Sequence, residues 1–322
     1  MVESSVIASD TLFVRHPGNP MLTPIRWPYP ANAVMNAGAT LVDGQTVLLC
    51  RVEDRRGISH LTVARSSDGF SNWVVEAEPL MCPHPDHPEE QWGVEDPRVT
   101  RIDEIDGWAI TYTAFAPGGP GISLATTEDF RTVRRHGLVR VPEDKNGVVL
   151  PRRVDGKWIL FHRPTTVMGA RSDIWLSRSA DLDSWSSPEP VLATREGGWW
   201  DSARVGMGPP PLETSEGWLV VYHGVRQTVA GALYRAGLAL LDLEQPARVL
   251  RRSPEWVLGA QMPYELMGDV PNVVFPCGLT TPDGSDELRL YYGAADTCIG
   301  LATGSLSTVL SYLLSCPPGS GG

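Results

Sequence analysis

The stretch Asp155-Gly156-Lys157-Trp158-Ile159-Leu160-Phe161-His162-Arg163 is a turn followed by an apolar run that ends in two basic side chains. Asp-Gly before a β-run is a strong short-range hairpin signal. Related stretches, each a turn followed by an apolar run, begin at Asp43-Gly44, Asp106-Gly107, Glu216-Gly217 and Ser285-Asp286-Glu287. The sequence therefore predicts five strands of one kind, each of which follows a tight turn.

A second repeated mark follows each of these strands. Its copies begin at Ala64, Ala125, Ser177, Ala239 and Ala302, and the differences between successive numbers are 61, 52, 62 and 63. A period of this length with about four strands per unit is typical of β-propeller blades. Gly (32) and Pro (28) are plentiful, whereas long amphipathic helical patterns are scarce. We therefore predict an all-β fold: one five-bladed β-propeller domain over residues 1–322, with residues 316–322 as a disordered tail.

Charge and composition exclude several classes of partner. The net charge of −11 argues against non-specific binding to nucleic acid or to an anionic membrane. No signal peptide is visible, and no apolar run approaches the roughly 18 residues that span a membrane. The five cysteines show no paired spacing, so we expect reduced thiols in a cytoplasmic protein. An anionic small molecule stays compatible with this chain, because a local basic pocket can exist in an acidic protein.

The heptad Trp92-Gly93-Val94-Glu95-Asp96-Pro97-Arg98 places two adjacent carboxylates and an arginine around a proline. Proline biases Asp96 toward an extended conformation, so Glu95 and Asp96 should point to opposite sides of the backbone. We therefore expect one acid, rather than a carboxylate pair, to face a shared pocket. Taken alone, the heptad favours an Asp–Arg salt bridge that closes a loop, and Glu95 and Arg98 keep this structural interpretation.

Polar residues recur at the far ends of the repeated strands. In a propeller these positions meet around one central channel, so residues far apart in the sequence would converge on one pocket. Arg163, Arg204 and His223 together suit a tetrahedral oxyanion, and Lys145-Asn146 could add a cation and an amide donor. Each has an alternative: Arg163 could bridge neighbouring blades, Arg204 could be solvated in its loop, and His223 could be a satisfied core residue.

Metal and dinucleotide sites are not predicted. His84-Pro85-Asp86-His87 has a metal-like spacing, but it lies in a proline-rich loop without further ligands. Gly206-Met207-Gly208 is followed by three prolines rather than by a helix, which excludes a dinucleotide or Walker loop. We expect no metal and no cofactor.

Several segments together resemble glycoside hydrolase family 130, whose inverting mannoside phosphorylases are five-bladed β-propellers. The resemblance extends from about residue 19 to residue 304 and is carried by Asn32-Ala33-Val34-Met35-Asn36-Ala37-Gly38, Arg51-Val52-Glu53-Asp54-Arg55, Gly93-Val94-Glu95-Asp96-Pro97-Arg98, Phe161-His162-Arg163-Pro164, Gly217-Trp218-Leu219-Val220-Val221-Tyr222-His223-Gly224, Gly268-Asp269-Val270-Pro271-Asn272-Val273-Val274-Phe275-Pro276 and Tyr291-Tyr292-Gly293-Ala294-Ala295-Asp296.

The resemblance implies roles for individual residues. Asp96 matches the single catalytic acid, which relays its proton to the glycosidic oxygen through the 3-hydroxyl of the bound mannose. Three residues match mannose-binding positions: Asn36, Arg51 and Asp296. Six match or accompany phosphate ligands: Lys145, Asn146, Arg163, Arg204, His223 and Tyr234. Arg204 stands where many members have lysine, a departure that keeps the charge but presents a larger fork of donors.

The expected reaction is phosphorolysis with inversion of a β-1,4- or β-1,2-linked manno-oligosaccharide, or of a mannosyl-glucose or mannosyl-N-acetylglucosamine, to α-D-mannose 1-phosphate. The partners are then a β-mannoside and inorganic phosphate as co-substrate, and assembly into a homo-oligomer is left open. One acid with a basic cluster fits this reaction, because an inverting hydrolase needs a second carboxylate. The alternatives are an inverting β-mannosidase, a non-catalytic sugar-binding propeller, and an arabinanase- or fructosidase-type enzyme, which would need several acids around the axis.

Overall fold

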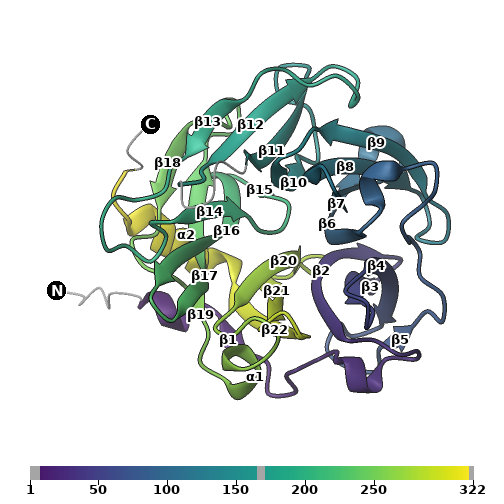
Figure 1. Ribbon diagram of the computed structural model, residues 1–322. Coiled ribbons are helices and arrows are strands. Elements are labelled where there is room, and N and C mark those ends of the chain that lie inside the picture. Colours follow the sequence, from purple (N-terminus) through teal and green to yellow (C-terminus); the bar gives the residue numbers. More distant parts are fainter. Residues whose placement is uncertain (1–7, 165–170, 319–322) are drawn as a thin grey trace.

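The computed structural model describes residues 8–164 and 171–318, and strands make up most of them (Figure 1). Within these residues the regular helices are short: α1 (Pro263–Leu266), α2 (Leu306–Ser315) and the 3-10 turns η1 (Ser9–Thr11), η2 (Pro24–Arg26), η3 (Pro88–Glu90) and η4 (Asp103–Ile105). The all-β prediction is therefore confirmed. No helix in the described residues is both long enough and apolar enough to cross a membrane.

The strands form antiparallel units that follow one another along the chain, and we number the units from the first to the fifth. The first comprises β2 (Ala33–Val42), β3 (Gln45–Glu53), β4 (Ser59–Ser66) and β5 (Val74–Val75). The second comprises β6 (Gly93–Ile102), β7 (Gly107–Ala116), β8 (Gly119–Thr127) and β9 (Arg134–Arg140). A single parallel pair, Ser59 with Gly93, joins these two units into one sheet.

The remaining units are separate sheets. The third comprises β10 (Asp144–Val149), β11 (Trp158–Pro164), β12 (Ile174–Ser179) and β13 (Glu189–Leu192). The fourth comprises β14 (Arg204–Met207), β15 (Leu212–Thr214), β16 (Gly217–Thr228), β17 (Gly231–Leu241), β18 (Val249–Arg252) and β19 (Leu258–Gly259). The fifth comprises β20 (Val274–Thr280), β21 (Glu287–Ala294), β22 (Cys298–Ser305) and β1 (Val14–Arg15).

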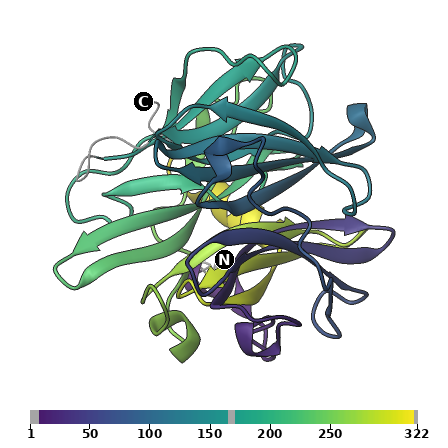
Figure 2. The same cartoon turned by 45° about the vertical axis from the view of Figure 1, so that its right-hand side comes forward.

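The five predicted hairpin strands are all present, as β3, β7, β11, β16 and β21. Each pairs antiparallel with the opening strand of its unit, which is β2, β6, β10, β14 or β20. A cavity of about 390 Å³ is lined by residues in or just after all five opening strands: Thr40, Thr100, Pro151, Pro210 and Thr280 among others. The opening strands therefore converge on one central region, and β2 of the first unit lies beside β20 of the fifth (Figures 1 and 2).

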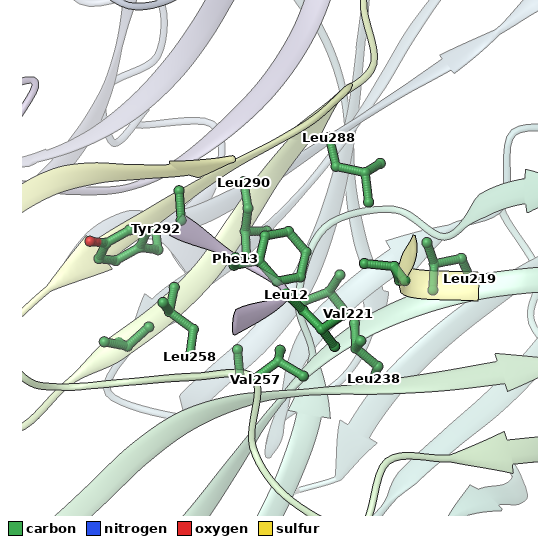
Figure 3. Close-up of a cluster of buried hydrophobic side chains, with 14 of the residues drawn as sticks. Leu12, Phe13, Leu219, Val221, Leu238, Val257, Leu258, Leu288, Leu290 and Tyr292 are labelled. Atoms are coloured by element: carbon green, nitrogen blue, oxygen red, sulfur yellow. The ribbon is translucent and has the colours of Figure 1, made fainter. Parts of the chain in front are cut away.

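Strands from both ends of the chain meet in the fifth unit. β1 pairs with β22, with Val14 opposite Thr303 and Arg15 opposite Ala302. Just before β1, Leu12 and Phe13 are 3% and 2% exposed and lie between side chains of the fourth and fifth units (Figure 3). This N-terminal segment therefore packs two neighbouring units together.

The C-terminal end differs from the predicted disordered tail at its first residue. Cys316 is buried, and its Sγ lies 3.3 Å from the carbonyl oxygen of Tyr312. Pro318 forms an isolated bridge with Arg251. Burial of the Cys316 side chain against α2 explains why the segment is ordered there, although its composition is rich in Pro, Gly and Ser. Residues 319–322 of the predicted tail lie outside the described residues.

Candidate active site

Asp96 does not adopt the extended conformation that Pro97 predicts. Its φ is +49°, in the left-handed region, which Asp and Asn tolerate better than most residues. The β6–β7 register shifts between Glu95 and Arg98, which marks a β-bulge, and bulges re-aim side chains. As a result Glu95 and Asp96 both contact Arg51, at 3.2 and 3.0 Å, instead of facing opposite sides of the strand. That part of the prediction was wrong.

A left-handed residue at a β-bulge also occurs in two other opening strands. Asn36 has a φ of +48° where the β2–β3 register shifts between Met35 and Gly38. Asn146 has a φ of +57° where the β10–β11 register shifts between Lys145 and Val148. Three units thus carry an Asn or Asp at a bulge in the opening strand, and all three residues belong to the predicted site.

The carboxylate of Asp96 is held by its neighbours. Asn36 Nδ2 donates to Asp96 Oδ1 at 2.8 Å, and Arg51 Nη1 donates to the same oxygen at 3.0 Å. Gly293 leaves the room for Asn36, because a Cβ at position 293 would lie 1.8 Å from Asn36 Oδ1. Burial alone would raise the pKa of Asp96, but the charges of Arg51 and Arg98 outweigh it and hold that pKa below its ordinary value. The carboxylate is therefore ionised at neutral pH.

Asp296 lies just after β21, and its pKa is shifted upward, opposite to the shift of Asp96. Burial and the charge of Asp96 raise the pKa of Asp296 to about 6, against an attraction from Arg51 that lowers it. Arg51 therefore acts on four carboxyl groups: it contacts Glu53, Glu95 and Asp96 directly and attracts Asp296 through space. The predicted mannose-binding residues Asn36, Arg51 and Asp296 are thus grouped around the predicted acid.

Arg163 is a buried cation at the end of β11. It is 6% exposed, and within residues 8–164 and 171–318 it makes no ion pair with a carboxylate. Its Nη1 donates to His223 Nε2 at 3.2 Å, and its Nε has no hydrogen-bond partner among the residues that the structure describes. Burial lowers the pKa of Arg163 to about 10, and the nearby charge of Arg204 acts in the same direction. An unpaired buried guanidinium of this kind is suited to binding an anion.

His223 and Asn146 meet above a glycine. A Cβ at Gly206 would lie 2.4 Å from His223 Cε1 and 2.7 Å from Asn146 Oδ1. His223 is fully buried, and burial together with the charges of Arg163 and Arg98 lowers its pKa well below the ordinary value. His223 is therefore neutral at pH 7. The Oδ1 atom of Asn146 is buried and has no hydrogen-bond partner within the described part of the chain.

The other predicted phosphate residues border this group. Arg204 begins β14 and is close enough to lower the pKa values of both Arg163 and His223. The Tyr234 ring stacks on the His223 ring with centroids 6.1 Å apart. Lys145 Nζ lies 3.9 Å from Glu95 Oε2, which connects the basic group to the carboxylates around Arg51. The structure thus brings all ten predicted site residues into one region.

Side chains beside the predicted residues point elsewhere, because neighbours on a strand alternate between its two faces. His162 is fully buried and bonds Asp144 through Nδ1 at 2.7 Å. Tyr222 donates to Asp201 at 3.0 Å, and Tyr112 donates to Glu90 at 2.6 Å. His162, Tyr222 and Tyr112 therefore belong to the core rather than to the site.

Sequence reasoning missed the two glycines and gave Arg98 only a structural role. Gly206 and Gly293 matter through the space they leave, and nothing in their local sequence indicates which side chain fills it. Glu95, also assigned a structural role, pairs with Arg51 and Lys145. In the described residues no group of three or more His, Cys, Asp and Glu side chains could hold a metal ion.

Comparison with known proteins gives a consistent result. The family model of glycoside hydrolase 130, described as beta-1,4-mannooligosaccharide phosphorylase, matches residues 19–314. A beta-1,4-mannooligosaccharide phosphorylase of Ruminococcus albus is 32% identical over 94% of this chain and 90% of its own length. A 1,2-beta-oligomannan phosphorylase of a Thermoanaerobacter species is 35% identical over 84% and 89%. The solved complex of the Listeria innocua beta-1,2-mannobiose phosphorylase with beta-1,2-mannobiose superposes with a TM-score of 0.85, at 28% identity over 94% and 99% of the two chains.

Proposed function

The chain belongs to glycoside hydrolase family 130, and on that premise we propose that it is a β-mannoside phosphorylase that acts with inversion. Its substrates are a β-linked mannoside and inorganic phosphate, and its products are α-D-mannose 1-phosphate and the shortened sugar. The observation that carries the proposal is Arg163, a buried guanidinium with no carboxylate partner in the described residues, bonded to the neutral ring of His223. This arrangement leaves a positive charge for an anion to neutralise.

The architecture that goes with this function is one five-bladed β-propeller domain. Five antiparallel units, an opening strand from each beside one central cavity, and β1 pairing with β22 all support it. In such a domain the opening strands surround the axis. The bulges at Asn36, Asp96 and Asn146 then aim one polar side chain from each of three blades toward that axis.

We assign phosphate to the basic group and mannose to the carboxylate group. Arg163, Arg204 and His223, with Lys145, Asn146 and Tyr234 around them, hold phosphate so that one of its oxygens attacks the anomeric carbon. The C–O bond to the leaving sugar breaks as the new bond forms on the opposite face, so the β-configuration becomes α. Asn36, Arg51 and Asp296 hold the mannose. Phosphate is already a nucleophile and needs positioning and partial neutralisation of its charge rather than a catalytic base.

Asp96 supplies the proton that the leaving oxygen takes up, relayed through the 3-hydroxyl of the mannose. The charges of Arg51 and Arg98 keep the pKa of Asp96 low, which favours the anion over the acid. An incoming phosphate carries negative charge next to the same cations and raises that pKa, because a nearby like charge disfavours ionisation. Phosphate binding and the protonation of Asp96 are therefore coupled in this proposal.

Hydrolysis is the competing reaction. An inverting glycosidase needs a second carboxylate to activate water, at about 6.5–9.5 Å from the acid. Glu95 faces the same side as Asp96, so it is the nearest candidate for that role. However, Glu95 already pairs with Arg51 and with Lys145, at 3.2 and 3.9 Å. A carboxylate engaged by two cations is not free to take a proton from water, which favours phosphorolysis.

The test is to incubate purified protein with β-1,4- or β-1,2-mannobiose, with and without inorganic phosphate, and to measure mannose 1-phosphate and free mannose. We expect α-mannose 1-phosphate only with phosphate, and no turnover by Asp96→Asn. Release of free mannose at the same rate without phosphate would show a hydrolase. Sugar binding that persists in both proteins without any turnover would show a non-catalytic propeller. The relatives include β-1,4 and β-1,2 phosphorylases, so reverse synthesis with α-mannose 1-phosphate and several acceptors identifies the linkage.

We also place the enzyme in the cytoplasm. All five cysteines are free, and four of them are buried, as expected for thiols that stay reduced.

A further inference from the structure

Arg98 is a buried cation that forms no direct ion pair with a carboxylate in the described residues, although its charge attracts the Asp96 carboxylate through space. The side chain is 0% exposed, and its hydrogen bonds all go to backbone carbonyl oxygens. Nε donates to Gly208 at 2.6 Å, Nη1 to Asp96 at 2.8 Å and Nη2 to Met207 at 3.4 Å. In the part of the chain that the structure describes, it has no ion pair with a carboxylate. A buried charge without a direct ion pair is costly, so the burial of Arg98 calls for a physical reason.

The position of this guanidinium connects the acid to the basic group. It belongs to β6 in the second unit and reaches the carbonyls at the end of β14 in the fourth unit. It also lies over the ring of Phe275 in the fifth unit, 5.4 Å from the centroid. That ring is 4.5 Å from the ring of His223, which accepts the hydrogen bond from Arg163. The Arg98 guanidinium therefore lies close both to the Asp96 segment and, across the Phe275 ring, to the Arg163–His223 pair.

The hydrogen bond from Arg98 to the Asp96 carbonyl has a local consequence. Asp96 is in the left-handed conformation at a bulge, where the ladder with β7 is interrupted. An interrupted ladder leaves backbone groups without strand partners. Arg98 Nη1 satisfies the carbonyl of Asp96, and its other two bonds attach this segment to β14. The direction of the Asp96 side chain thus depends on Arg98.

We propose that Arg98 is a positioning residue with a second, electrostatic role: it fixes the backbone of Asp96, and its positive charge draws an anion to the Arg163–His223 pair. This proposal rests on the proposed function, because phosphate is the anion concerned. The lowered pKa values of Asp96 and His223 agree with a positive charge close to both. Arg98 does not itself bind phosphate in this proposal. It acts through its neighbours, and the phosphate-binding residues named above keep their roles.

The experiment compares Arg98→Gln, which removes the charge, with Arg98→Lys, which keeps it but loses the fork. Arg195→Gln is the matched control, because Arg195 also donates to two backbone carbonyls, those of Pro254 and Ser253. Phosphate binding is first measured without turnover, as thermal stabilisation by inorganic phosphate against chloride at equal ionic strength. Steady-state kinetics then give KM for phosphate, KM for mannobiose and kcat.

We expect Arg98→Gln to weaken phosphate binding by about tenfold or more, the effect of one unit charge acting over about 10 Å at an effective dielectric constant of about 20. Arg98→Lys should recover most of this affinity while its kcat stays low, because the Asp96 carbonyl loses its partner. Arg195→Gln should leave phosphate affinity unchanged. Equal phosphate affinity in Arg98→Gln and wild type would overturn the electrostatic role. An equal loss of phosphate affinity in Arg98→Gln and Arg98→Lys would overturn it too. If Arg98→Gln does not fold, the Arg98→Lys variant alone tests the proposal: near wild-type phosphate affinity with a lowered kcat supports it, and any other combination overturns it. Failure of the proposed function would appear separately, as turnover that does not depend on phosphate.

Discussion

Asp296 offers the sharpest test, because its buried carboxyl group links the site to the stability of the whole protein. Burial and the charge of Asp96 raise the pKa of Asp296 from 3.8 to about 6. One pKa unit corresponds to about 1.4 kcal/mol, so the ionised Asp296 destabilises the folded state by about 3 kcal/mol. The folded protein binds this proton more tightly than the unfolded chain does. The contribution of Asp296 to the free energy of unfolding is therefore highest below about pH 4, falls as the pH rises to about 6, and stays lowered above that.

Asp296→Asn removes the titrating group and keeps its shape. The difference in unfolding free energy between variant and wild type should shift in favour of the variant by up to about 3 kcal/mol between about pH 4 and pH 7. Urea unfolding followed by tryptophan fluorescence measures it, since the chain has 11 tryptophans. Asp286→Asn is the control with the opposite sign, because hydrogen bonds from Ser305 and Ser307 lower the pKa of Asp286. Parallel pH curves for wild type and Asp296→Asn would refute the reasoning. The gain in stability should accompany weaker mannoside binding, as expected for a group kept for function.

Three further outcomes follow from the site. Arg163→Met should raise the free energy of unfolding in phosphate-free buffer by about 1–4 kcal/mol, because it removes an uncompensated buried charge, and should abolish stabilisation by phosphate in a thermal-shift assay. Gly293→Ala should lower kcat by at least about tenfold while circular dichroism stays native, because the new Cβ would lie 1.8 Å from Asn36 Oδ1 and displace a donor to Asp96; wild-type kcat would contradict this. Gly206→Ala should raise KM for phosphate more than KM for the mannoside, since the added methyl group meets His223 and Asn146, and equal changes in both constants would argue against a phosphate pocket there.

The repeat in the sequence predicted the positions that converge, because equivalent strands carry equivalent residues. The register aligns Met35 with Arg51 in the first unit and Lys145 with Arg163 in the third. It also pairs Gly206 with His223 in the fourth. The turn–strand repeat therefore predicts the all-β class and places Arg51, Arg163 and His223 at equivalent strand ends.

The failures have local causes. Pro97 predicts an extended Asp96, but the bulge in β6 depends on the partner strand, which the heptad does not contain. Arg98 bonds carbonyls of residues 207 and 208, more than a hundred positions away, and a carbonyl acceptor carries no signature in the sequence. Gly206 and Gly293 are needed because side chains from other strands occupy the space that a Cβ would fill. Contacts between distant residues of this kind are set by the fold.

The pairing of β1 with β22 also sets an order in time for the newly made chain. Val14 and Arg15 leave the ribosome well before their partners Thr303 and Ala302, which come almost 290 positions later. At about 5–20 residues per second, the early strand waits roughly 15–60 s for its partner. Arg15 waits similarly for Glu265, which it binds at 2.7 Å and which is fully buried. During biosynthesis the apolar pair Leu12 and Phe13 is therefore exposed to chaperones and proteases until translation of the fifth unit is nearly complete.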